Sequence, residues 1–154
     1  MRKNFNMDFG WKFHLGDIEE NRKNNHSDSY HAAKAGKTFT AARQNLDDSS
    51  WRDVNLPHDY LAEAEIGEYN LLSHGFRTRS NAWYRKSFTL SENLKDKHIF
   101  LCFEGTAVTA DFYLNGSIVA KTASAYTETG IDITDRVYFG DKVNVLAVYI
   151  GGFA

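Results

Sequence analysis

The second half of the chain is a succession of short strand-like segments joined by turns. Asn115-Gly116 lies between two of them, and this residue pair predicts a two-residue type I′ hairpin turn. Val143–Ile150 is apolar on both faces, which is typical of a central strand. Alternating apolar side chains predict further strands over residues 83–90, 97–104, 108–114 and 117–121. Short strands at this spacing, without a long helical pattern, predict an all-β sandwich.

The first half of the chain carries weaker patterns. Phe9, Trp11, Phe13 and Leu15 alternate with smaller or polar residues, which predicts a half-buried strand. Residues 17–37 are polar and predict a surface loop or insertion, with a short helical turn near residues 30–34. Asp and Ser residues before Trp51 predict a capped turn that buries this ring. The 154 residues are the length of one domain, so we treat residues 1–154 as a single unit.

Composition excludes several classes of partner. The net charge is −2 and no basic stripe is visible, so a nucleic-acid partner is not expected. No run approaches 18 apolar residues, and no apolar segment follows the N-terminal Met-Arg-Lys. We therefore expect no membrane span and no secretory signal, which favours a cytoplasmic protein. Cys102 is the only cysteine, so no intrachain disulfide can form, and its apolar surroundings predict a buried, inert thiol.

Several short motifs occur in a fixed order along the chain. They are Leu56-Pro57-His58-Asp59-Tyr60, Trp83-Tyr84-Arg85-Lys86, Phe103-Glu104-Gly105, Leu114-Asn115-Gly116, Asp132-Ile133-Thr134 and Asn144-Val145-Leu146-Ala147-Val148. In this order they resemble the N-terminal sugar-binding domain of glycoside hydrolase family 2, the family of β-galactosidases, β-glucuronidases and β-mannosidases. The resemblance runs from about Phe9 to Val148. It departs from the family pattern at Tyr60, where the family has Trp, and over Ser124–Thr129.

The resemblance implies a galactose-binding-domain-like jelly-roll β-sandwich. Pattern alone does not separate a jelly roll from an immunoglobulin-like sandwich. In the family, further strands follow the last motif and complete the sandwich, so we expect this domain to lack its last strands. An unpaired sheet edge, open to self-association, is then expected.

The resemblance also places catalysis outside this chain. Retaining glycosidases need a pair of closely spaced carboxylates. In this family both lie in a barrel domain, and the acid follows an asparagine. None of the eight Glu residues here follows Asn, so we expect no catalytic residue and no hydrolysis by this chain alone.

Four residues are candidates for substrate binding. Asp59 could accept hydrogen bonds from sugar hydroxyls, with His58 beside it, because a carboxylate offers several acceptor lone pairs to a polyol. The alternative is that both residues merely fix the loop after Pro57. Arg77 and Asn81 precede the Trp83 strand, where the family often places substrate-facing loops, and the alternative is that they are ordinary exposed residues. We expect Arg85 to pair with a carboxylate on the sandwich surface.

No cofactor is expected from the sequence. The six histidines show no metal-ligand spacing, so no metal site is predicted, and a structural calcium is neither supported nor excluded. The expected partners are a β-galactoside or related sugar and the barrel domain of a parent enzyme. Galactose is favoured over glucuronate by the Leu-Pro-His-Asp motif. Two other functions stay open, namely a free-standing carbohydrate-binding module and a structural or oligomerisation domain without sugar contact.

Overall fold

The computed structural model describes residues 2–18, 41–63, 80–106, 109–123 and 127–151. Its elements are almost all strands. They are β1 (Trp11–Leu15), β2 (Arg52–Val54), the short helix α2 (Tyr60–Glu63), β3 (Ala82–Phe88), the 3₁₀ turn η2 (Glu92–Leu94), β4 (Phe100–Phe103), β5 (Thr109–Leu114), β6 (Ser117–Thr122), β7 (Thr129–Asp132) and β8 (Asn144–Gly151). No helix among the described residues is long and apolar enough to cross a membrane.

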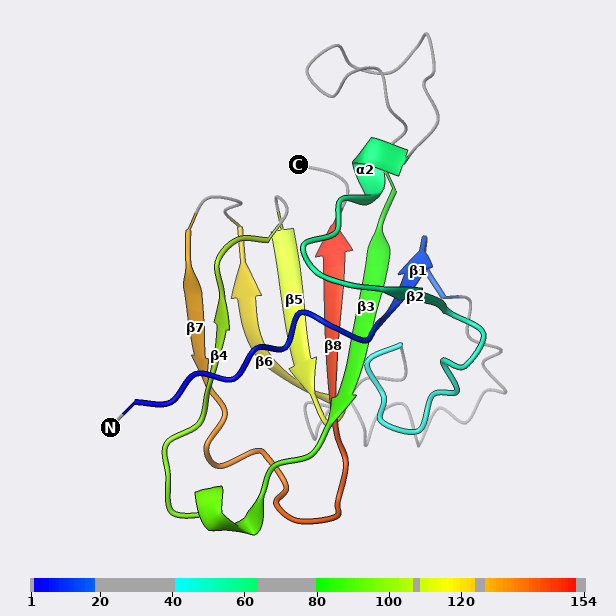
Figure 1. Cartoon of the computed structure of the whole chain (residues 1–154). Helices are drawn as coiled ribbons and strands as arrows, with labels where there is room; N and C mark the ends of the chain where they lie inside the picture. The colour runs from blue at the N-terminus through cyan, green and yellow to red at the C-terminus, as the bar shows by residue number, and fades with distance from the viewer. Residues whose placement is uncertain (1, 19–40, 64–79, 107–108, 124–126, 152–154) are drawn as a thin grey trace, which may run out of the picture.

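The strands form two antiparallel sheets. The larger sheet has six strands in the order β2-β1-β3-β8-β5-β6, and β4 pairs with β7 in a second, two-stranded sheet (Figure 1). β8 lies between β3 and β5, which confirms the predicted central strand. Within the described residues β4 and β7 pair only with each other, so each has one side without a strand partner. Self-association through such an edge stays a prediction.

One face of the six-stranded sheet packs against the small sheet and forms the main core. Because side chains alternate between the two faces of a strand, Phe13, Phe112 and Val148 point to this face. They belong to one buried cluster with Leu101 of β4 and Ile131 of β7. The rings of Phe103 and Phe112 lie 4.7 Å apart across the interface between the sheets. Phe112 is buried within this cluster, and Phe103 is partly buried against it.

The opposite face, which we call the outer face, is covered by residues 41–51, which precede β2 and which we call the covering segment. Trp51, Ala41 and Ala42 of this segment pack on Trp83 and Ala147 in a second buried cluster. The backbone N–H of Ser49 donates to the carboxylate of Asp47, and that of Trp51 donates to the carbonyl of Asp48. The predicted capped turn that buries Trp51 is therefore confirmed.

The hairpin between β5 and β6 also follows its prediction. Asn115 and Gly116 have φ angles of 51° and 83°, as both central residues of a type I′ turn require. The expectation for Cys102 was wrong, because the thiol is exposed. β4 alternates, so Leu101 and not Cys102 faces the core. Most of the polar 17–37 segment, including the helical turn expected near residues 30–34, lies outside the described residues.

Candidate functional site

Four neighbouring strands have a terminus at the same end of the six-stranded sheet. β1 and β8 end there, and β3 and β5 begin there (Figure 1). The backbone N–H of Gly16, just after β1, donates to the carbonyl of Asn81, just before β3, at 2.6 Å. This bond places the side chains of Asp17 and Asn81 beside each other. The Asn81 amide nitrogen lies 3.3 and 3.2 Å from the two carboxylate oxygens of Asp17.

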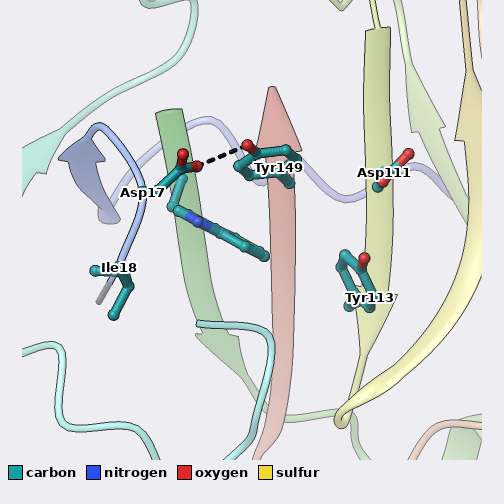
Figure 2. A pocket seen from close by; sticks show the side chains of 6 residues that line it. Asp17, Ile18, Asp111, Tyr113 and Tyr149 are labelled. Carbon is teal, nitrogen blue, oxygen red and sulfur yellow. Dashed lines mark hydrogen bonds between the residues drawn. The ribbon is translucent and has the colours of Figure 1, made fainter. Parts of the chain in front are cut away.

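Tyr149 of β8 completes this group. Its hydroxyl donates to the Asp17 carboxylate at 2.7 Å, a contact that Figure 2 shows as a dashed line. We refer to Asp17, Asn81 and Tyr149 as the Asp17 triad. The triad joins three elements that are far apart in sequence, because Asp17 and Tyr149 are separated by 132 positions.

A pocket of about 260 Å³ opens beside the triad on the outer face. Trp83, Tyr149 and Asp111 stand opposite one another on β3, β8 and β5, so their side chains share this face. The Trp83 ring lies 4.7 Å from the Tyr149 ring and 6.0 Å from the Tyr113 ring. The full lining is Asp17, Ile18, Trp83, Asp111, Tyr113 and Tyr149 (Figure 2). The pocket therefore combines aromatic surface with two carboxylates.

The two tyrosine hydroxyls in this pocket stay protonated. Burial and the hydrogen bond to Asp17 raise the pKa of Tyr149 above its ordinary value. Burial, followed by the negative charge of Asp111, raises the pKa of Tyr113. Each hydroxyl can therefore donate as well as accept a hydrogen bond.

His58 lies elsewhere, on the core side of the sheet. It follows a cis Leu56–Pro57 peptide bond, and its side chain is nearly buried. Its Nδ1 lies 2.7 Å from the Tyr84 hydroxyl and its Nε2 lies 3.3 Å from a Glu63 oxygen. The Phe13 ring meets the imidazole edge-on at 4.7 Å. These contacts fix the loop after Pro57, and a sugar contact by His58 stays a prediction.

Glu63 connects His58 to an ion pair at the surface. Both of its carboxylate oxygens accept from Arg52, at 2.6 and 2.7 Å. The hydrogen bonds from Arg52 lower the pKa of Glu63 to about 2, with a smaller contribution from His58. Burial raises the pKa of Tyr84, on the other side of His58.

Asp59 is exposed, and its side chain accepts from the backbone N–H of Leu61 at 2.9 Å. This contact caps the start of α2. The second carboxylate oxygen of Asp59 has no hydrogen bond among the described contacts, so the predicted role in sugar binding is compatible with this position and stays a prediction. The Tyr60 hydroxyl donates to the carbonyl of Ser80 at 2.7 Å, which links the His58 loop to the residue before Asn81.

The structure thus brings together only part of the predicted site. Asn81 joins the Asp17 triad, whereas His58 and Asp59 form a separate group, and Arg77 lies outside the described residues. Sequence reasoning missed Asp17, Asp111, Tyr113 and Tyr149. The available clue was the period of two along the strands, which places Trp83, Tyr113 and Tyr149 on one face once the strand register is known.

Arg85 requires a correction. As expected, Arg85 pairs with a carboxylate, that of Asp48, at 2.9 Å. The Arg85 side chain, however, is buried and does not lie at the surface. The guanidinium also donates to the carbonyls of Ala41, Arg43, Gln44 and Leu46. Arg85 therefore holds the covering segment on the outer face of the sheet.

Metal binding finds no support in the described part of the chain. Its His, Cys, Asp and Glu side chains form no group of three or more that could hold a metal ion.

The fold and this site can be compared with known proteins. A family model described as glycosyl hydrolase 2 galactose-binding domain-like matches residues 43–151. The chain belongs to this family. The family 2 domain is 29% identical over 153 residues to a β-glucuronidase of Formosa agariphila, which covers 96% of this chain and 13% of that protein. It is 32% identical over 110 residues to a β-galactosidase of Thermoanaerobacter pseudethanolicus, covering 71% of this chain and 14% of that protein.

Solved structures agree with this assignment. The family 2 domain superposes on a glycosyl hydrolase family 2 member from Bacteroides cellulosilyticus with a TM-score of 0.74 and 33% identity, over 96% of this chain and 17% of that one. The expected galactose-binding-like β-sandwich is confirmed. The family 2 domain spans between 13% and 17% of the length of these relatives.

Proposed function

We propose that this chain is the sugar-binding domain of a longer family 2 glycosidase and that the Asp17 triad and its pocket contact the sugar. The family match supports the first part of the proposal. The second part rests on one observation, namely a pocket that combines aromatic rings with carboxylate and hydroxyl groups at the end of the sheet where β1 and β8 end and β3 and β5 begin.

The chemistry of the pocket suits a pyranose. A sugar ring presents apolar C–H faces and a rim of hydroxyl groups. The rings of Tyr113 and Tyr149 offer apolar contact surface, and carboxylates such as Asp17 and Asp111 accept several hydrogen bonds from a polyol. Asn81 and Tyr149 hold the Asp17 carboxylate in place, which reduces the entropy lost when a ligand binds.

The charge of the pocket favours a neutral sugar. Asp17 and Asp111 both line it, and a uronic acid would bring a third carboxylate close to them. The relatives include both β-galactosidases and β-glucuronidases. We therefore propose a β-galactoside-type substrate over a glucuronide.

Bond cleavage would take place in another domain of the parent enzyme. The sequence resemblance assigns bond cleavage to a barrel domain. Because this chain covers only a small share of its relatives' length, a parent enzyme of similar length has room for such a barrel. The role proposed for this chain is to form one wall of the active site and to pack against that barrel.

Titration of the chain with methyl β-galactoside and methyl β-glucuronide, followed by amide NMR, tests sugar binding. We expect shifts at Tyr113, Tyr149 and Asp111 with the galactoside, at millimolar concentrations, and weaker shifts with the glucuronide. Tyr149→Phe removes the hydroxyl that orients Asp17 and should weaken the shifts. Tyr138→Phe is the matched control, because Tyr138 packs against Lys142 and does not line the pocket. Equal shifts in both variants would contradict the assignment of this pocket.

A free-standing carbohydrate-binding module is the second candidate function. The observation in its favour is that side chains of β3, β5 and β8 in this domain already line a pocket. Tight binding of a sugar by the isolated chain would favour this module. Weak binding that a barrel domain strengthens would favour the proposed wall of an active site.

A further inference from the structure

The hairpin turn between β5 and β6 places a chemically labile residue pair at a fixed position. Both central residues of the turn have positive φ, which Asn and Gly adopt more readily than other residues. Asn115-Gly116 is also the only Asn-Gly pair among the 154 residues. The geometry of the turn therefore favours this pair over alternatives with bulkier side chains.

An Asn-Gly pair is prone to spontaneous deamidation, because glycine has no side chain to shield its backbone nitrogen. In this reaction the backbone nitrogen of Gly116 loses its proton and bonds to the side-chain carbonyl carbon of Asn115. The Asn115 amide nitrogen leaves as ammonia, and a cyclic succinimide forms. Water then opens the ring at either carbonyl and leaves aspartate or isoaspartate, with no change in oxidation state.

The folded chain holds the Asn115 amide in four hydrogen bonds. Its oxygen accepts from the backbone N–H of Val145 at 2.8 Å and from the side-chain amide of Gln44 at 3.2 Å. Its nitrogen donates to the carbonyl of Arg136 at 3.2 Å and to the side-chain oxygen of Asn144 at 3.0 Å. These bonds use both donors and both acceptor lone pairs of the side chain. Only 9% of Asn115 is exposed.

A second residue braces this arrangement. Asn144 is fully buried, and its amide exchanges hydrogen bonds with the backbone N–H and carbonyl of Tyr138, at 2.8 and 3.0 Å. The backbone N–H of Asn115 also donates to the carbonyl of Val145 at 2.9 Å. We call Asn115, Asn144 and Gln44, with the backbone groups that they bind, the Asn115 network.

We propose that Asn115 is the site of spontaneous deamidation in this chain and that the Asn115 network controls its rate. The carbonyl carbon of Asn115 cannot reach the nitrogen of Gly116 until its amide leaves the four hydrogen bonds. Deamidation therefore proceeds through local opening of the hairpin. The product is damaging, because a carboxylate has no donors for the Arg136 carbonyl and the Asn144 oxygen that it would face.

The rate is measured by incubating the folded chain at mildly alkaline pH and following residue 115 by peptide mass spectrometry. The reference is the unstructured peptide Tyr113-Leu114-Asn115-Gly116-Ser117. We expect the folded chain to deamidate at least about tenfold more slowly than the peptide, because only the opened fraction reacts. Equal rates in the folded chain and the peptide would overturn the proposal.

Two variants separate the network from general stability. Gln44→Ala removes one hydrogen bond from an exposed side chain and should speed deamidation by about fivefold. Asn45→Ala, at the exposed neighbouring position, should leave the rate unchanged. An equal acceleration in both variants would contradict control by the network. Asn115→Asp reproduces the product and should lower the denaturation midpoint, and an unchanged midpoint would contradict the predicted damage.

Discussion

The two faces of the six-stranded sheet are covered in different ways. On the core face, apolar and aromatic side chains pack against the two-stranded sheet, and the hydroxyls of Tyr60 and Tyr84 have hydrogen-bond partners. On the outer face, the covering segment is held by a buried guanidinium, and a pocket with two carboxylates stays open beside it. The core face thus follows from apolar alternation, whereas the outer face depends on particular hydrogen bonds. The pocket that combines carboxylates with tyrosine hydroxyls lies on the face that apolar packing does not fill.

The largest effect is expected on the core face. Phe112→Ala removes a fully buried ring between the two sheets and should lower the free energy of unfolding by about 4 kcal/mol. Urea denaturation followed by circular dichroism measures this loss. Phe100→Ala, at an exposed position of β4, is the matched control and should cost far less. Similar losses in the two variants would contradict the assignment of the core face.

Arg85→Met tests the outer face and should cost about 3 kcal/mol, because the Asp48 carboxylate and several carbonyls lose their donor. Trp51 fluorescence should shift to the red as the covering segment loosens, since the guanidinium lies 6.0 Å from its ring. Lys12→Met removes a partly exposed ion pair with Asp53 and serves as the control. A loss no greater than that of the control would show that apolar packing alone holds this segment.

Tyr149→Phe has a smaller effect on stability, because it removes one hydrogen bond and keeps the ring. We expect a loss of about 1 kcal/mol. The same denaturation experiment measures it, with Tyr138→Phe as the reference. If Tyr149→Phe were more stable than the unsubstituted chain, the Tyr149 hydroxyl would not stabilise the fold through its hydrogen bond to Asp17.

The smallest effect concerns the acid stability of the Glu63 group. The folded-state pKa of Glu63 is about 2, below its ordinary value of 4.5. The carboxylate therefore contributes stability above pH 4.5, and this contribution disappears as the pH falls from about 4.5 to about 2. In Glu63→Gln the stability should fall less steeply across this window. Glu104→Gln, at an exposed position, is the control, and equal slopes in the two variants would contradict the prediction.

Local pattern was sufficient for much of the fold. The central β8 strand and the Asn115-Gly116 turn depend on neighbouring residues, and both were predicted. Cys102 was placed wrongly because a continuous apolar run does not show which of its residues face a core on one side only. In the same way, nothing near Arg85 in the sequence indicates that a distant segment covers it.

The candidate site was less predictable because it depends on strand register. Asn81 was identified from the family resemblance, but its partner Asp17 lies 64 positions away, and Tyr149 comes from the opposite end of the chain. Contacts of this kind appear only when the order of strands is known. Asp59 contacts its own loop, whereas His58 contacts Tyr84, 26 positions away, so the sequence located their loop without showing which way each side chain points.

The exposed thiol of Cys102 makes the domain convenient for site-specific labelling. A maleimide dye would attach at a single position without any mutation, because the chain has no other cysteine. The dye would lie on the outward side of the two-stranded sheet, away from the pocket on the outer face of the larger sheet. A change in its emission on adding a separately produced barrel domain would report docking on the small sheet. A change in Trp83 fluorescence without a change in the dye emission would report docking at the pocket.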